Sequence, residues 1–346
     1  MEPLFMPEKN LGFYLEAFTS LKQDSAGVKK NGFAAPHMPI LVLSLIQGFE
    51  RGIFTDERIY LTPELIDLFT SNWALLIKSG NYHPIIAQPF YHLKSKGNFP
   101  IWWRLVAKPG CEIWLMNAGS MHSLSNLTSA VDHAEIDIEL AILLTERQNR
   151  QLLQHTVLQK YFPSQATIDL SSAGNHIDEI GQQIISEDPE TYIATVRHLK
   201  DKFSGTAPNI QRELYQQELL VRGGAFKREV PKHYGYTCCI SGLKIDATFN
   251  ISMIDACHIV PFAKSYNDTI TNGIALCPNL HRAFDRGLIA VDDNYKVILS
   301  QHFIEPPNAL YSIKKLAGIS IILPSDQRHY PLIENFAWHR KHIFKL

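Results

Sequence analysis

The stretch between residues 254 and 287 constrains the fold of this chain more than any other. It places His258 at the end of an apolar run, Asn272 fourteen residues later, and His281 nine residues after that. The β-branched and apolar residues before His258 predict a strand. Asn272 and the glycine after it predict a tight turn, because both tolerate positive φ. A proline three residues before His281 predicts a short helix. Strand, turn, strand and helix form the smallest scaffold that can hold one metal ion between a hairpin and a helix.

This order of side chains suits the hydrolysis of a phosphodiester bond, which needs an activated water and a stabilised oxyanion. A neutral histidine can take a proton from water near pH 7. A divalent ion held by a carboxylate and an imidazole can neutralise the phosphate and the leaving oxygen. An asparagine side chain can brace the histidine and fix its tautomer. The alternative is that each of the 15 histidines is an ordinary surface or core residue, and the spaced pattern favours the nuclease interpretation.

The same stretch resembles the HNH endonuclease family. Its ββα-metal motif runs Ala-His-Ile-x-Pro, then Asn-Gly-Ile/Leu-x-Leu-Cys, then a histidine followed by Phe-Asp-x-Gly. This sequence reads CHIVP from residue 257, NGIALC from residue 272 and HRAFDRG from residue 281, and YGYTC from residue 234 resembles the usual lead-in. The resemblance covers roughly residues 220–300. It implies that His258 is the general base, Asn272 the orienting residue and His281 a metal ligand.

The chain departs from the family's pattern at the position before the general base. Many members carry a metal-binding Asp or His there, and this chain carries Cys257. Asp255 lies two residues earlier, on the same face of the predicted strand as Cys257. We therefore expect Asp255 to be the second protein ligand beside His281, with Cys257 as the alternative. The implied cofactor is one divalent metal ion, Mg²⁺ or Mn²⁺, with Zn²⁺, Ni²⁺ and Co²⁺ as other candidates.

The first half of the chain carries short motifs rich in proline and aromatic residues. APHMP, from residue 35, precedes an apolar run, and PFYHL (89–93) and IWWRLV (101–106) predict the two strands of a hairpin around a turn at residues 96–98. Aromatic surfaces flanked by cations suit a nucleic-acid backbone, and the cations here are Lys29, Lys30, Lys94, Lys96 and Arg104. The alternative is that the aromatic residues form the core of a small α+β domain.

These motifs resemble the sulfur-binding domain of phosphorothioation-dependent restriction endonucleases, over roughly residues 10–120. In that family a proline-lined apolar cavity receives the sulfur that replaces a backbone oxygen. Sulfur is larger and less strongly hydrated than oxygen, so such a cavity penalises the normal phosphate. The resemblance implies DNA and sulfur binding by His37, Pro89, Phe90, His92 and Arg104. Met38 and Gln88 depart from the family's pattern, so a related domain that reads other DNA is the alternative.

Bulk composition sets limits on the class of protein. The hydrophobic fraction of 45% predicts a normal buried core. With a formal net charge of −1, a nucleic-acid enzyme must concentrate its basic residues locally. The five cysteines include no CxxC pair and are expected to be mostly reduced, which suits a cytoplasmic protein. The first residues do not resemble a signal peptide, and no apolar run approaches the roughly 20 residues that span a bilayer.

Helical periodicity and capping residues predict several helices. They lie at residues 10–24, from Pro39 onward, after the cap at Thr62, and over residues 130–160 and 210–226. The last of these is predicted to end at the two glycines 223 and 224.

The chain is predicted to be an α+β protein with three parts. These are an N-terminal α/β DNA-reading domain (1–160), a helical and loop linker (161–215) and a C-terminal ββα-metal nuclease domain (216–346). We expect an endonuclease that binds phosphorothioate-modified double-stranded DNA and cuts it nearby. Double-strand cleavage by one site per chain indicates a homodimer. The alternatives are an HNH endonuclease that reads another modification or unmodified DNA, and a catalytically inactive DNA-binding regulator.

Overall fold

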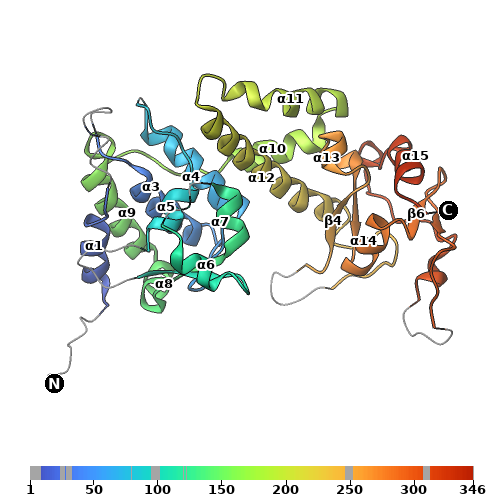
Figure 1. Ribbon diagram of the computed structural model, residues 1–346, viewed down its shortest axis with the longest axis horizontal. Helices are drawn as coiled ribbons and strands as arrows, with labels where there is room; N and C mark the ends of the chain where they lie inside the picture. Colours follow the sequence, from blue (N-terminus) through green and yellow to red (C-terminus); the bar gives the residue numbers. More distant parts are fainter. Residues whose placement is uncertain are drawn as a thin grey trace. The chain divides into compact units, whose positions relative to one another are not determined.

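The computed structural model of the chain describes residues 9–23, 28, 33–78, 80–94, 102–119, 121, 123–245, 252–306 and 312–345. The chain forms two compact units. The first comprises Met1–Ile177 with Phe203–Val221, and the second comprises Asp178–Lys202 with Arg222–Leu346 (Figure 1). Residues 161–215, which the sequence predicts to be a linker, are therefore divided between the two units.

The first unit is built around helix α3 (His37–Glu50), which is buried from Pro39 to Phe49. This confirms the central helix that the apolar run predicts. Among the described residues, the other helices bounded wholly within the unit are α1 (Leu11–Thr19), α4 (Pro63–Leu76), α5 (Ala87–His92), α6 (Glu112–Asn117), α7 (Leu124–Ala130), α8 (Ile138–Thr145) and α9 (Arg147–Tyr161), followed by the turn η1 (Pro163–Gln165). Helices α4, α5, α8 and α9 pack on α3. Thr62 caps α4 as predicted, because its hydroxyl accepts a hydrogen bond from the backbone N–H of Leu65 at 3.3 Å.

An antiparallel sheet completes the first unit, in the order β1 (Arg58–Ile59), β3 (Val131–Ile136) and β2 (Trp103–Ala107). The predicted hairpin is wrong, because residues 87–92 form helix α5. Pro89 lies in the first turn of α5, where its missing N–H costs no hydrogen bond, and Ile86 and Phe90 are fully buried one turn apart. The predicted turn at residues 96–98, like Lys29 and Lys30, lies outside the described residues.

Strand β3 replaces the first turns of the helix predicted over residues 130–160. It is the middle strand of the sheet and pairs with both neighbours, so burial on this sheet outweighs the helical preference of the segment. Helix begins only at Ile138. The neighbouring Trp102 and Trp103 are both buried, and the indole of Trp103 donates a hydrogen bond to the Phe90 carbonyl at 3.0 Å. These aromatic residues are therefore core.

The second unit begins with helices α10 (His176–Ser186) and α11 (Pro189–Lys202) and the later turns of α12 (Pro208–His233). Helix α12 continues past Gly223, where the sequence predicts its end. Each glycine costs a helix about 1 kcal/mol. The continuing turns bury Phe226 and Val230, and a Cβ on Gly273 would come within 2.6 Å of Val230 and 3.1 Å of Phe226. This close packing accounts for the longer helix.

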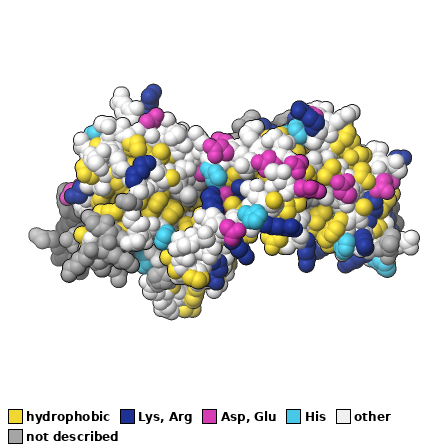
Figure 2. Space-filling model, turned by 90° about the horizontal axis from the view of Figure 1, so that it is seen from above, with side chains coloured by type: hydrophobic (Ala, Val, Ile, Leu, Met, Phe, Trp, Pro, Cys, Tyr) yellow, Lys and Arg dark blue, Asp and Glu magenta, His cyan; other side chains and the backbone are white. Residues whose placement is uncertain are grey.

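Small strands and short helices form the rest of the second unit. In chain order they are β4 (Asp255–His258), α13 (Phe262–Ser265), η2 (Ile270–Asn272), β5 (Gly273–Leu276), α14 (Pro278–Asp285), β6 (Ile289–Val291), β7 (Val297–Leu299), η3 (Ile313–Leu316), η4 (Gln327–His329) and α15 (Ile333–His342). On the face drawn in Figure 2, Lys and Arg side chains occur in small groups separated by acidic and apolar ones. Within the described part of the chain, no helix combines the length and apolar character that crossing a membrane requires.

Candidate active site

Strands β4 and β5 and helix α14 form the predicted strand–strand–helix unit. The strands pair antiparallel, with His258 opposite Gly273 and Asp255 opposite Leu276. Pro278 lies in the first turn of α14, as predicted. The predicted tight turn at residues 272 and 273 is wrong, because Gly273 has an extended φ of −118° and α13 and η2 lie in the connection. Glycine is needed there for the close approach of α12, not for positive φ.

His258 lies at the end of β4 between two partners. Its Nε2 is 2.7 Å from Oδ1 of Asp268, a carboxylate that is 1% exposed. The ring of Phe226, on α12, stacks on the imidazole with ring centroids 3.8 Å apart and planes 7° apart. About a quarter of the side chain remains open to solvent, at 25% exposure. His258 is thus held firmly and still accessible to a water molecule.

Asn272 is fully buried and uses its whole amide group on backbone atoms. Its Oδ1 accepts a hydrogen bond from the Val260 N–H at 3.0 Å. Its Nδ2 donates to the carbonyl oxygens of Val260 and Asn267, both at 2.9 Å. The sequence predicts that Asn272 braces His258 and fixes its tautomer. In the structure it instead fixes the main chain that follows His258, and Asp268 contacts the imidazole.

A cluster of possible metal ligands lies between β4 and α14. Ligand atoms of Cys257, His281 and Asp285 all lie within 4.8 Å of one another. His281 and Asp285 are one helical turn apart, with Nε2 of His281 3.4 Å from Oδ2 of Asp285. The other ring nitrogen, Nδ1, is 3.1 Å from Oδ2 of Asp255. The structure therefore brings Asp255 and His281 together, as predicted, and adds Asp285, which the sequence argument did not select.

The donor set of this cluster fits a divalent ion. An imidazole with a carboxylate suits ions from Mg²⁺ and Mn²⁺ to Zn²⁺, whereas a thiolate would favour softer ions. Cys257 is fully buried, and burial with the nearby Asp285 carboxylate raises the pKa of its thiol well above the usual range. Its Sγ lies 3.8 Å from Oδ1 of Asp285, to which the thiol can donate. The Cys257 thiol therefore stays protonated and is a poor ligand, which leaves the imidazole and the carboxylates to bind the ion.

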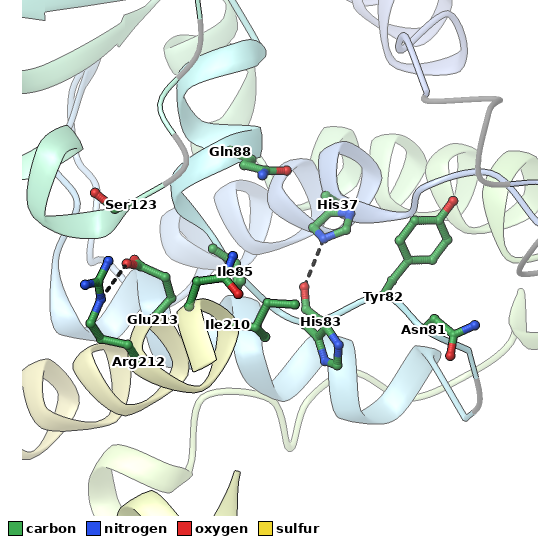
Figure 3. A pocket seen from close by; sticks show the side chains of 11 residues that line it. His37, Asn81, Tyr82, His83, Ile85, Gln88, Ser123, Ile210, Arg212 and Glu213 are labelled. Carbon is green, nitrogen blue, oxygen red and sulfur yellow. Dashed lines mark hydrogen bonds and ion pairs between the residues drawn. The ribbon is translucent and has the colours of Figure 1, made fainter. Parts of the chain in front are cut away.

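In the first unit, a cavity of about 460 Å³ lies beside the start of α3 (Figure 3). Its lining residues are His37, Asn81, Tyr82, His83, Ile85, Gln88, Ser123, Asn209, Ile210, Arg212 and Glu213. Nε2 of His37 is 2.9 Å from the His83 carbonyl oxygen, to which it donates. Burial lowers the pKa of His37 to about 4, so its ring is neutral near pH 7.

The residues predicted to bind sulfur do not all reach this cavity. His37 and Gln88 line it, whereas Phe90 is fully buried against Trp103 and lines a separate cavity of about 200 Å³. Among the described residues that line the larger cavity, Pro89, His92 and Arg104 do not appear. The guanidinium of Arg104 is engaged elsewhere, since Nη1 lies 3.1 Å from Oδ1 of Asp137.

Helix α12 supplies a wall of the cavity that sequence reasoning missed. Glu213 is buried and its Oε2 accepts a hydrogen bond from the Leu124 N–H at 2.7 Å. One turn further on, Gln217 accepts a hydrogen bond from the Ile86 N–H at 2.9 Å and donates to the Pro84 carbonyl at 2.8 Å. These contacts join segments more than 80 residues apart in the chain, so no local pattern could have revealed them.

One comparison with known proteins falls in the second unit. Residues 238–292 match the family model described as HNH endonuclease. No curated protein matches the chain. Among solved structures, the chain is similar to one described as a modification-dependent TagI restriction endonuclease, at 21% sequence identity and a TM-score of 0.25. That similarity covers 34% of this chain and 37% of the other.

Proposed function

We propose that the protein is a nuclease that cuts double-stranded DNA in response to phosphorothioate linkages, and the match of residues 238–292 to the HNH endonuclease family supports its nuclease part. The observation that carries the nuclease part is the arrangement around β4 and α14. A partly exposed His258, held by a carboxylate, lies in the same small domain as His281 and its acidic neighbours. That combination provides a proton acceptor and a cation site for one scissile phosphate.

In this proposal the side chains of the site have distinct roles. His258 takes a proton from the attacking water through the ring nitrogen that does not face Asp268. Asn272 keeps the backbone after His258 in place through its three hydrogen bonds. His281 would hold the divalent ion together with a carboxylate, either Asp285 on the side of Nε2 or Asp255 on the side of Nδ1. The ion, when bound, would neutralise charge on the phosphate.

The cavity of the first unit is the proposed reader of the modification. Tyr82, Ile85 and the neutral ring of His37 give one side of it an apolar and uncharged surface, which favours weakly hydrated sulfur over phosphate oxygen. Arg212 lies on the wall formed by α12, with Nε 4.0 Å from Oε1 of Glu213. Its side chain is 67% exposed, so the guanidinium can also pair with the anionic linkage. Of the residues that the resemblance implies, this proposal uses His37, and not Phe90 or Arg104.

Binding to matched duplexes tests the reader. Duplexes of one sequence would carry a plain backbone, one phosphorothioate linkage of either stereochemistry, or a modified base. We expect one phosphorothioate stereoisomer to bind at least about tenfold more tightly than the plain duplex, which corresponds to about 1.4 kcal/mol. His37→Ala should reduce this preference, whereas His198→Ala, at a side chain that is 78% exposed, should not. Equal affinity for plain and phosphorothioate duplexes would overturn the proposed modification.

We further propose that two copies of the chain act together. Ile138 and Ile142, one turn apart on α8, are each 60% exposed, and Leu152 on α9 is 44% exposed. Exposed apolar side chains such as these suit a self-complementary contact. Sedimentation of the protein with and without DNA should reveal a dimer, and Ile142→Glu should dissociate it. A wild-type protein that stays monomeric on DNA while cutting both strands would contradict this proposal.

A further inference from the structure

Asp268 is the side chain that contacts His258 through a direct hydrogen bond. It lies in the loop between α13 and η2, and its Oδ1 is 2.7 Å from Nε2 of the imidazole. An ionised carboxylate can only accept, so Nε2 must carry the proton of the neutral ring. The loop is itself fixed, because Oδ1 of Asn267 accepts hydrogen bonds from the N–H and hydroxyl of Thr269 at 2.8 and 2.7 Å.

The second oxygen of Asp268 faces helix α11. The hydroxyl of Tyr192 donates to Oδ2 of Asp268 at 3.4 Å, a long hydrogen bond between fully buried groups. Burial and the negative charge of Asp268 raise the pKa of Tyr192, so its hydroxyl stays protonated and donates to the carboxylate. The Arg222 guanidinium lies 5.5 Å from the centre of the Tyr192 ring and donates to Gln183 of α10. Helices α10 and α11 thus support Asp268 from outside residues 238–292.

We infer that Asp268 and Tyr192 are positioning residues that hold His258 in the Nε2–H tautomer, so that Nδ1 is the atom that accepts the proton from water. The inference rests on the proposed nuclease function of the site. A carboxylate that fixes the tautomer of a catalytic imidazole also stabilises the imidazolium that forms when the ring takes up a proton. Tyr192 does not contact His258 itself. Its hydroxyl binds Oδ2 of Asp268 and so keeps Oδ1 directed at His258.

The role of Tyr192 makes Asp268→Asn an unusually informative substitution. An amide has one oxygen and one NH₂ group. A phenol hydroxyl can donate and accept, but the Tyr192 oxygen already accepts a hydrogen bond from Arg222, so its O–H is left to donate toward residue 268, and only the amide oxygen can accept it. The NH₂ group then faces Nε2 of His258 and donates to it, which forces the ring proton onto Nδ1. In Asp268→Asn combined with Tyr192→Phe, that preference disappears, and the amide can turn its oxygen toward Nε2. The double variant should therefore regain part of what Asp268→Asn loses.

Nitrogen NMR of histidine-labelled protein tests the tautomer without any cleavage. The two ring nitrogens of His258 would be identified as the signals that His258→Gln removes. We expect the wild type to carry its proton on Nε2, Asp268→Asn to carry it on Nδ1, and the double variant to show a mixture. A wild-type ring protonated on Nδ1, or an unchanged tautomer in Asp268→Asn, would overturn the inference.

Cleavage kinetics give the second readout. The substrates are plasmid DNA with Mn²⁺ and the chromogenic phosphodiester thymidine 5′-p-nitrophenyl phosphate, which needs no recognition of a modification. Asp268→Asn should lower kcat by roughly 10²-fold or more, with KM changed less than about threefold. Tyr192→Phe should cost only about threefold or less, and the double variant should be several-fold faster than Asp268→Asn. A double variant whose loss in kcat equals the product of the two single losses would contradict the inference.

A matched control removes another tyrosine hydroxyl from the same unit. The hydroxyl of Tyr295 donates to the Pro331 carbonyl at 2.9 Å and has no part in the site, so Tyr295→Phe should leave kcat and the His258 signals unchanged. A wild type with the expected tautomer that cuts neither substrate would support the positioning roles and count against the nuclease function. The two hypotheses can therefore fail separately.

Discussion

The phenyl ring of Phe226 lies flat against the imidazole of His258, with ring centroids 3.8 Å apart and planes 7° apart. Phe226 comes from helix α12, which precedes the HNH match at residues 238–292. The stack covers one face of the imidazole, and Asp268 holds its edge through Nε2. The orientation of the proposed base thus depends on a helix outside the family's motif.

Replacing Phe226 by leucine should separate this contact from general core packing. Loss of the stacked ring should destabilise the fold by about 1–2 kcal/mol and slow cleavage several-fold at unchanged DNA affinity. Phe336→Leu is the matched control, because Phe336 is equally buried in the same unit and contacts Tyr295 instead. Urea unfolding and single-turnover cleavage would check both variants. Equal slowing by the two substitutions would show that the stack has no specific effect.

Asp285→Asn should weaken metal binding. The carboxylate lies 3.4 Å from Nε2 of His281 and belongs to the cluster with Cys257, so neutralising it removes a charge that attracts the ion. We expect the Mn²⁺ affinity, measured by calorimetry on chelator-treated protein, to fall by at least about tenfold. Asp292→Asn, at a turn where the carboxylate accepts backbone hydrogen bonds, should bind Mn²⁺ like the wild type. An unaffected Asp285→Asn would leave Asp255 as the carboxylate ligand.

The stability of the first unit should fall in acid because of His37. Burial lowers the folded-state pKa of His37 to about 4 from 6.5, so the unfolded chain binds a proton in this interval and the folded chain does not. The contribution of His37 is complete above pH 6.5 and declines as the pH falls toward 4, by up to roughly 3 kcal/mol.

The comparison with His37→Gln isolates this effect. The difference in unfolding free energy between wild type and His37→Gln should become smaller between pH 7 and pH 4.5. The exposed His198 provides the control, since His198→Gln should show no such trend. Urea unfolding at the two pH values measures both, and a pH-independent difference for His37→Gln would contradict the prediction.

Two glycine substitutions on facing elements should have opposite signs. A Cβ on Gly273 would meet Val230 at 2.6 Å and Phe226 at 3.1 Å, so Gly273→Ala should destabilise by about 1–3 kcal/mol. Gly223 lies within helix α12 and a Cβ there would meet nothing within 4 Å. Gly223→Ala should therefore stabilise by about 0.5–1 kcal/mol. Thermal unfolding distinguishes the two, and a stabilising Gly273→Ala would show that α12 can move away.

Sequence reasoning succeeded where the determining interactions are local. Pro278 and the spacing of His258, Asn272 and His281 predict β4, β5 and α14, because each element carries its own start signal or periodicity. Thr62 likewise predicts the start of α4. The same reasoning made PFYHL a strand, because aromatic residues favour strands in general, whereas the burial of Ile86 and Phe90 selects a helix here.

The site residues that the sequence does not predict act through long-range contacts. Asp268 and Tyr192 are 76 positions apart in the chain, and nothing near either one announces their hydrogen bond. Gly273 reads as a turn signal from its neighbour Asn272, and only the packing of Val230 reveals why a side chain is excluded. The sequence indicates that Phe90 and Arg104 bind DNA. In the structure Phe90 lies in the core and Arg104 forms an ion pair with Asp137.

The chain passes between the two units three times, after Ile177, after Lys202 and after Val221. Residues 178–202 therefore belong with the nuclease, although the segments on either side of them belong with the first unit. A transfer of the second unit to another protein at a single junction near residue 216 would leave Tyr192 behind and remove its hydrogen bond to Asp268. A functional graft must carry α10 and α11 as well, which makes the nuclease a discontinuous module.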